Sequence, residues 1–169
     1  LDRGAPATDT DSADSAPANL DRPPAGSPRA AEWAQVERFV AQECPPWRVL
    51  RTELRVYSPN HRLAGSLDLL CRGSRPGAVV VYDYKRSPKH LERSVFVPFH
   101  PKNLRAQLNL YRAILERAYG LEVEAMFLVQ FYPELGGGDS FRVIPVQREQ
   151  EATDKLLENL QRRLRVRRL

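Results

Sequence analysis

Two strongly apolar runs separated by one amphipathic helix constrain the fold of this chain more than any other feature. The run AVVVYDYKR at residues 78–86 has high β propensity, and EVEAMFLVQFY at residues 122–132 has the continuous apolar centre of a buried strand. Between them, residues 103–119 repeat large apolar side chains at helical spacing, and Gly120 follows as a stop signal. A helix that joins two strands in this way predicts a mixed sheet.

The periodicity of the remaining segments extends this pattern at both ends. A helix, two strands, a short return strand and a final helix are predicted at residues 31–43, 48–58, 62–71, 140–147 and 149–164, in that order. The first two of these strands and the run at 78–86 lie close together along the chain and form an antiparallel meander. The predicted fold is therefore α/β, with an α-β-β-β-α-β core, a mixed central sheet flanked by helices, and an appended C-terminal strand and helix.

Composition divides the chain into a leader and one domain. Residues 1–30 contain five prolines, seven alanines and no aromatic residue, with three Arg against five Asp. Such a segment cannot bury enough apolar surface to offset its ordering entropy, which predicts a disordered Pro/Ala/Asp-rich leader at 1–30. Residues 31–169 form the predicted domain. Its net charge is +7, because the leader carries −2 of the chain's +5, and a basic body favours polyanionic partners.

Several functional classes are excluded by what the sequence lacks. No stretch approaches 18 consecutive apolar residues, so no membrane-spanning helix is expected. Two cysteines, Cys44 and Cys71, are too few for a cysteine-ligated iron–sulfur cluster, and the three histidines are scattered. The simplest interpretation of the cysteines is two small buried thiols in a reducing intracellular compartment.

Charged residues interrupt two apolar strands, and they carry the chemistry. Asp68 lies in the middle of LAGSLDLL, and Asp83 lies in VVVYDYK with Lys85 two positions later on the same strand face. A hairpin connection can bring the two aspartates together, where a divalent cation would relieve their repulsion. The alternative is structural: an Asp83–Lys85 ion pair on an edge strand and a solvated Asp68.

On the helix at 103–119, Gln107 and Tyr111 are four residues apart and share a face. The order Gly65-x-x-Asp68, Asp83-x-Lys85 and Gln107-x-x-x-Tyr111 resembles the PD-(D/E)XK nuclease superfamily, and more narrowly its RecB-like and viral-exonuclease-like branch. The resemblance covers roughly residues 31–135. It implies the restriction-endonuclease-like version of the predicted α/β core.

The resemblance also implies roles for individual residues. Asp68, Asp83 and the backbone carbonyl of Tyr84 would bind Mg²⁺ or Mn²⁺, and Lys85 would position or activate the attacking water. Gln107 and Tyr111 would order the site or touch the nucleic acid. Some relatives add an acidic residue; the candidates here are Glu37 and Glu53, and a solvated position is the alternative for each. Some relatives also carry an iron–sulfur cluster, which this sequence cannot ligate.

A proline-rich insert separates the Asp-x-Lys strand from the helix. It and the start of the helix offer Lys89, Lys102 and Arg105 as phosphate contacts, or form a solvated loop. The hypothesis that follows is a Mg²⁺- or Mn²⁺-dependent deoxyribonuclease, an exonuclease in preference to an endonuclease, in DNA repair, recombination or replication. The alternative is a catalytically silent nucleic-acid-binding or scaffold module with the same fold.

Overall fold

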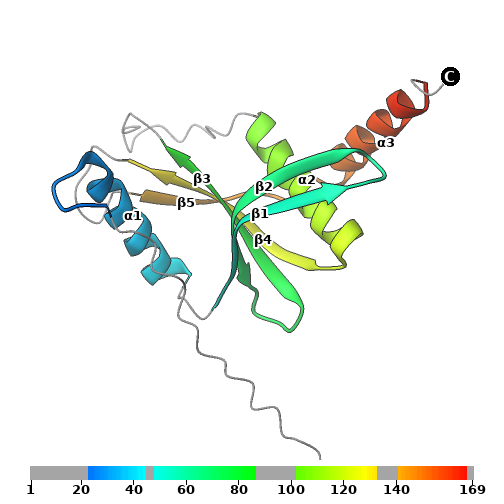
Figure 1. The fold of residues 1–169 in the computed structure, drawn as a ribbon. Helices are drawn as coiled ribbons and strands as arrows, with labels where there is room; N and C mark the ends of the chain where they lie inside the picture. Colours follow the sequence, from blue (N-terminus) through cyan, green and yellow to red (C-terminus); the bar gives the residue numbers. More distant parts are fainter. Residues whose placement is uncertain (1–22, 45–47, 87–101, 133–140, 167–169) are drawn as a thin grey trace, which may run out of the picture.

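The structure is a computed structural model that describes residues 23–44, 48–86, 102–132 and 141–166. This part of the chain forms three helices and five strands, whose arrangement can be followed in Figure 1. In sequence order they are α1 (Pro28–Glu43), β1 (Val49–Ser58), β2 (Leu63–Arg72), β3 (Ala78–Arg86), α2 (Lys102–Tyr119), β4 (Glu122–Phe131), β5 (Phe141–Pro145) and α3 (Gln150–Val166). This order confirms the predicted α-β-β-β-α-β core and its appended strand and helix.

The helix α1 begins three residues before its predicted start. Pro28 occupies the first turn, where its fixed φ suits a helix and its missing N–H is not needed. The last three residues of the predicted leader are therefore helical, and residues 1–22 of that leader lie outside the described residues. Gly120 ends α2 with a φ of 67°, a left-handed conformation that glycine adopts without a Cβ clash.

The five strands form one mixed sheet in the order β1-β2-β3-β4-β5. Three of the four strand pairs are antiparallel, and β3 and β4 are parallel because α2 carries the chain back between them. The register of the parallel pair runs from Ala78↔Glu122 to Arg86↔Phe131, so the carboxyl ends of both strands lie at one edge of the sheet. The predicted mixed sheet is confirmed.

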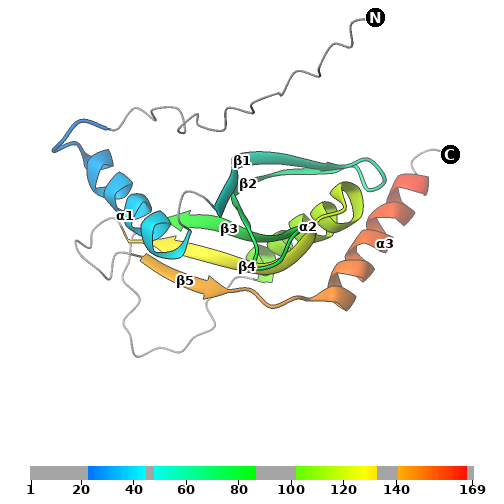
Figure 2. The same ribbon diagram turned by 90° about the horizontal axis from the view of Figure 1, so that it is seen from below.

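Two apolar cores hold the layers together. The α2 core packs the sheet against α2, and its members include Val79, Val81, Leu108, Ile114 and Leu115. The α1 core packs the opposite face against α1, where Phe39 makes edge-to-face contacts with Tyr82, Tyr84, Phe131 and Phe141. Figures 1 and 2 show α1 and α3 at opposite ends of the molecule. No helix within the described ranges is long and apolar enough to cross a membrane.

A buried polar cluster joins α2 to the start of α3. Asn109 donates from Nδ2 to the carbonyl of Gln147 at 3.0 Å and accepts from the N–H of Glu149 at 2.9 Å. The guanidinium of Arg112, 1 % exposed, donates from Nη1 to Glu116 and Gln150. Burial lowers the pKa of Arg112, and the Glu116 charge opposes that shift. These bonds fix the chain after β5 against α2.

The tip of the β1–β2 hairpin is tied to α3 through His61. Nε2 of His61 lies 3.1 Å from the amide nitrogen of Gln161, which can only donate, so Nε2 accepts this hydrogen bond. In the neutral ring the proton is then on Nδ1, which donates to Oγ of Ser58 at 2.9 Å. Burial and, secondly, the charge of Arg117 lower the pKa of His61. The neutral ring therefore supports this contact.

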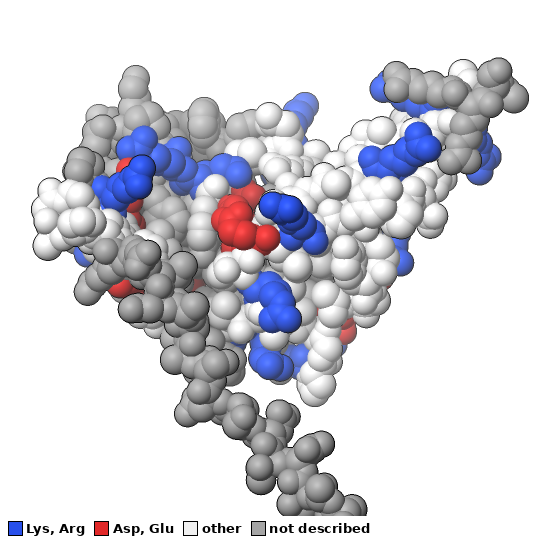
Figure 3. Space-filling model, in the orientation of Figure 1, with Lys and Arg blue, Asp and Glu red and all other residues white. Residues whose placement is uncertain are grey.

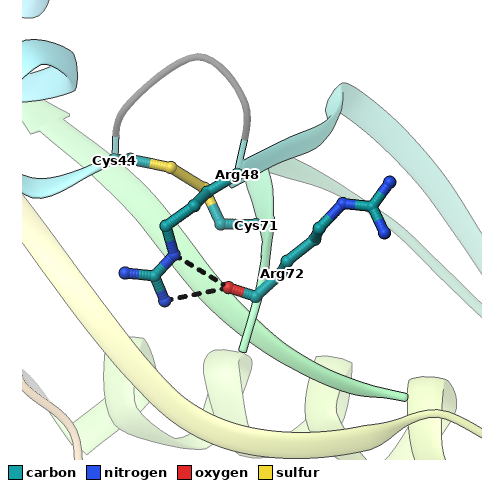
Figure 4. Close-up of a disulfide and its surroundings, with 4 residues drawn as sticks. All are labelled: Cys44, Arg48, Cys71 and Arg72. Carbon is teal, nitrogen blue, oxygen red and sulfur yellow. Dashed lines mark hydrogen bonds between the residues drawn. A yellow bond between two sulfur atoms is a disulfide. The ribbon is translucent and has the colours of Figure 1, made fainter. Parts of the chain in front are cut away.

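The two cysteines form a disulfide, which corrects the expectation of free thiols. Cys44 follows the last turn of α1 and is bonded to Cys71 on β2, 27 residues later, as Figure 4 shows. Beside it, Arg48 donates from Nε and Nη2 to the carbonyl of Arg72 at 3.2 and 2.9 Å. The pairing depends on α1 lying over β2, which the sequence spacing does not reveal. Because disulfides are rare in reducing compartments, the cysteines do not support the expected reducing compartment.

Candidate active site

A fork between β2 and β3 places the predicted acidic residues. The two strands pair from Arg72↔Val79 to Leu69↔Tyr82, and there the pairing ends. Beyond this point residues 63–67 pair only with β1, and residues 83–86 pair only with β4. Asp68 and Asp83 are the first residue of each strand past the last pair, so they lie on either side of the opening.

The carboxylate of Asp68 fills part of this opening. Its Oδ2 accepts a short hydrogen bond from the backbone N–H of Tyr84. That N–H points toward the vacated side of β3, where an antiparallel ladder would have supplied a carbonyl. Asp68 thus replaces the missing ladder bond with its side chain, and this bond fixes the carboxylate next to the backbone of β3.

Asp83 and Lys85 lie on the α2 side of the sheet. Along β3 their side chains share a face with those of Val79 and Val81, which belong to the α2 core, because every second residue of a strand points to the same side. Asp83 is 3 % exposed, and its Oδ2 forms an ion pair with Nζ of Lys85, whose side chain is one-third exposed. That oxygen has no other polar contact in the described residues.

The environment of Asp83 disfavours its charge. Burial raises the pKa of Asp83, the hydrogen bond and charge of Lys85 lower it, and the charge of Asp68 raises it again. The net pKa lies above the usual value of 3.8. Two carboxylates that repel each other, one of them buried beside a single ammonium, form a site that a further cation would stabilise.

The third motif approaches the fork from α2. Nε2 of Gln107 donates to the hydroxyl of Tyr111 at 2.8 Å, as their helical spacing allows. The Tyr111 ring packs directly on the backbone of Gly65: a Cβ there would overlap Cε1 of the ring and lie 2.9 Å from its Cζ and Oη. The glycine of the Gly-x-x-Asp segment is therefore needed for the close approach of this tyrosine.

The two candidates for an additional acid lie in different places. Glu53 lies between the pairs Thr52↔Leu69 and Leu54↔Leu67, which places it opposite Asp68. Its φ of 49° is unusual for a non-glycine residue, and such local strain is concentrated at functional sites. Burial and the charges of Asp68 and then Glu53 raise the pKa of the Tyr84 phenol, so both carboxylates are near that ring.

Glu37 is not part of this group. It lies on the exposed side of α1, and its Oε1 accepts from the indole N–H of Trp33 at 2.8 Å. Since α1 covers the face of the sheet opposite α2, Glu37 is separated from Asp83 and Lys85 by the sheet. The structure thus brings Glu53 to the fork and leaves Glu37 on the surface.

The predicted phosphate contacts are only partly described. Lys89 lies outside the described residues. Lys102 is exposed at the first position of α2, and one turn later Nη1 of Arg105 lies 3.6 Å from a carboxylate oxygen of Glu149. Figure 3 shows a small group of acidic side chains near the middle of this face, where Figure 1 draws the strands β1 and β2, with basic side chains close to it. That pattern suits a cation flanked by phosphates.

The donor set fits a hard divalent cation in part. The described ranges contain no group of three or more His, Cys, Asp or Glu that could hold a metal ion. The fork does contain two carboxylates, and a buried Asp83 oxygen has Lys85 as its single polar neighbour. Oxygen ligands of this kind suit Mg²⁺ or Mn²⁺, and Mg²⁺ sites are commonly built from one or two carboxylates plus water.

Comparison with known proteins places this chain in a family. The chain matches the model of the PD-(D/E)XK nuclease superfamily over residues 4–168. No curated protein matches it. A solved structure similar to it, described as a "Putative exonuclease" from Eubacterium rectale, has 13% sequence identity and a TM-score of 0.48. That match covers 79% of this chain and 50% of the other, so this chain spans half the length of that protein. Because the family match extends over almost the whole sequence, the chain belongs to the PD-(D/E)XK nuclease superfamily.

Proposed function

We propose that the chain is a divalent-metal-dependent nuclease that hydrolyses phosphodiester bonds of DNA. We place it in the RecB-like and viral-exonuclease-like branch of its superfamily, as an exonuclease in preference to an endonuclease, with a role in DNA repair, recombination or replication. The observation that carries this proposal is the convergence of Asp68, Asp83 and Lys85 at the fork between β2 and β3.

Three oxygen donors are proposed to hold Mg²⁺ or Mn²⁺: the carboxylates of Asp68 and Asp83 and the backbone carbonyl of Tyr84. When bound, the ion would polarise the scissile phosphate and lower the pKa of a water. Glu53 is the proposed additional acid in preference to Glu37, because it lies opposite Asp68 in the β1–β2 register.

Lys85 is proposed to supply the catalytic cation. Its stem follows a buried strand, and its ammonium stands at the partly exposed edge of the site beside Asp83. A point charge in that position can bind a phosphate oxygen or hold a water for attack. Gln107 and Tyr111 are proposed to order the site, since their hydrogen bond fixes the ring that packs on Gly65.

One observation favours the silent nucleic-acid-binding module as a second candidate. The ion pair between Lys85 and Asp83 compensates both charges without a metal ion. A purely structural pair would explain the same geometry. The two candidates differ in what happens when Lys85 is removed.

The test is cleavage of end-labelled linear DNA and of closed circular DNA, with Mg²⁺, with Mn²⁺ and with a chelator. The nuclease proposal expects metal-dependent loss of linear DNA, and removal of cleavage by several orders of magnitude in Asp68→Asn, Asp83→Asn and Lys85→Ala. Glu37→Gln is the matched control and should cleave as the wild type does. If Lys85→Ala instead loses stability and cleaves in proportion to its folded fraction, the pair is structural.

A further inference from the structure

The β1–β2 hairpin carries an exposed face that extends outward from Asp68 and Glu53, beyond the proposed catalytic site. In the outer half of the hairpin, buried and exposed residues alternate along both strands. The buried side packs on α2. The other side, here called the hairpin track, consists of Glu53, Arg55 and Tyr57 on β1 and their cross-strand neighbours Asp68, Ser66 and Ala64 on β2.

The far end of the hairpin track is aromatic. Tyr57 is 49% exposed, and Tyr119, at the last position of α2, is 48% exposed. The hydroxyl of Tyr119 accepts the backbone N–H of Tyr57 at 3.1 Å, because β1 is an edge strand and has no further strand to accept that bond. The Tyr119 hydroxyl thereby reaches the backbone of Tyr57, and two half-exposed tyrosines belong to this corner of the sheet.

The middle of the hairpin track carries one positive charge, flanked by small side chains. Arg55 is exposed and forms no ion pair with any residue in the part of the chain that the structure describes. The β2 residues beside it and beside Tyr57 are Ser66 and Ala64, whose small side chains leave the surface open. At about 3.4 Å per residue, Arg55 is about 7 Å and Tyr57 about 14 Å from Glu53 along the strand.

We propose that the hairpin track binds a single strand of nucleic acid, with a base stacked on Tyr57 and a phosphate on Arg55, and leads that strand toward Glu53 and Asp68 on the β1–β2 side of the fork. Aromatic rings flanked by unpaired cations are the usual surface for unpaired bases. The hairpin track gives the proposed nuclease a single-stranded substrate. Only the statement that this nucleic acid runs toward the fork rests on the proposed nuclease function.

Two other occupants fit the surface less well. A duplex has its bases already stacked on each other, so it offers no free base face to Tyr57. A peptide strand added to the open edge of β1 would need the N–H of Tyr57, which the Tyr119 hydroxyl already occupies. The arrangement of ring, cation and small residues therefore favours a flexible polyanion with planar groups.

The first experiment measures affinity with a chelator present, so that nothing is cleaved. The probes are a single-stranded DNA of about a dozen nucleotides and an abasic strand of the same length, which keeps the phosphates and lacks the bases. Tyr57→Ala should weaken binding of the normal strand by about 5- to 150-fold and leave the abasic strand unaffected. Tyr57→Phe should retain the wild-type affinity, because the ring remains.

Arg55→Ala should behave differently. It should weaken binding of both strands and reduce the slope of log affinity against log salt by about 0.7, the value for one phosphate contact on a single strand. Unchanged affinity in Tyr57→Ala, or an equal loss for the normal and the abasic strand, would overturn the stacking assignment.

A fluorescence readout keeps the proposal testable if Tyr57→Ala folds poorly. Tyr57→Trp should be quenched by the single strand, because a stacked base lies against the indole. Leu156→Trp, at a 38% exposed position on α3, is the matched control and should not be quenched. The chain's two native tryptophans give the same background in both variants. Equal quenching of both variants, or quenching of Tyr57→Trp by duplex as strongly as by single strand, would contradict the proposal.

The two proposals fail in distinguishable ways. Base-dependent binding through Tyr57 in a chain that cleaves no substrate would support the hairpin track and contradict the nuclease assignment. Metal-dependent cleavage together with unaltered binding by Tyr57→Ala would support the nuclease and overturn the hairpin track.

Discussion

Replacing Gly65 by alanine should test directly whether the Gly-x-x-Asp and Gln-x-x-x-Tyr segments support each other. The added Cβ would overlap Cε1 of Tyr111 and lie 2.9 Å from Cζ and Oη. Tyr111 is 8% exposed and its ring is enclosed by the α2 core, so it cannot swing into solvent. Overpacking of this kind lowers the free energy of unfolding by about 1–3 kcal/mol. The lower conformational entropy of the unfolded alanine chain offsets about 0.4–1 kcal/mol of this loss.

A double-mutant cycle isolates this contact. Leucine at position 111 lacks the three atoms that the Cβ would meet, so Gly65→Ala in a Tyr111→Leu background should be neutral or stabilising by up to about 1 kcal/mol. The coupling free energy should therefore be about 1–3 kcal/mol, measured by urea unfolding.

Gly77→Ala is the matched control for this cycle. Gly77 has a φ of 79° and no heavy atom within 4 Å of its added Cβ. Alanine there should cost about 1–2 kcal/mol through backbone strain alone, in both backgrounds. Additivity of Gly65→Ala and Tyr111→Leu to within about 0.5 kcal/mol would refute the contact.

Three further predictions concern stability. The raised pKa of Asp83 means that the folded state keeps this proton above the usual pKa of 3.8, so stability should fall as pH rises from there toward the raised pKa; urea midpoints across pH should show no such fall in Asp83→Asn. The lowered pKa of His61 means that the unfolded state binds this proton first, so stability should fall as pH drops below about 6.5. In thermal melts, the melting temperature of His61→Gln should not show this loss at low pH. If it falls with pH as steeply as that of the wild type, the His61 ring is not the group responsible. Reduction of the Cys44–Cys71 disulfide should lower the unfolding free energy by about 3–4 kcal/mol for its 27-residue separation, whereas a Cys44→Ala/Cys71→Ala variant should not respond to reductant.

Local periodicity explains why the fold could be predicted from the sequence. The strand at 78–86 is buried on both faces over its first six residues, and the strand at 122–132 is largely buried in its second half, so their apolar runs identify them without knowledge of their neighbours. The helix between them must return the chain, and this forces the parallel pair. The helix α1 begins three residues before the start that periodicity predicts, because Pro28 suits the first turn of a helix although it adds no apolar repeat.

Contacts between distant segments were harder to predict. The choice between Glu37 and Glu53 stayed open because it depends on the register of the hairpin: β1 and β2 pair from Ser58↔Leu63 inward, and this register places Glu53 opposite Asp68. The disulfide could not be foreseen, because its two residues meet only when α1 packs on β2. The burial of Arg112 also escaped prediction: its ion-pair partner Glu116 is one turn away on α2, but Gln150, its second partner, lies 38 residues later at the start of α3.

Asp68 and Asp83 are proposed to bind one divalent ion that Lys85 does not ligate. Calorimetric titration of Mn²⁺ into the wild type, Asp68→Asn, Asp83→Asn and Lys85→Ala measures this binding, with thermal melts to establish that each variant is folded. We expect one site in the wild type, its loss in both asparagine variants, and its retention in Lys85→Ala, which should nevertheless fail to cleave DNA. Undiminished Mn²⁺ binding in folded Asp68→Asn or Asp83→Asn would show that these aspartates are not the metal ligands.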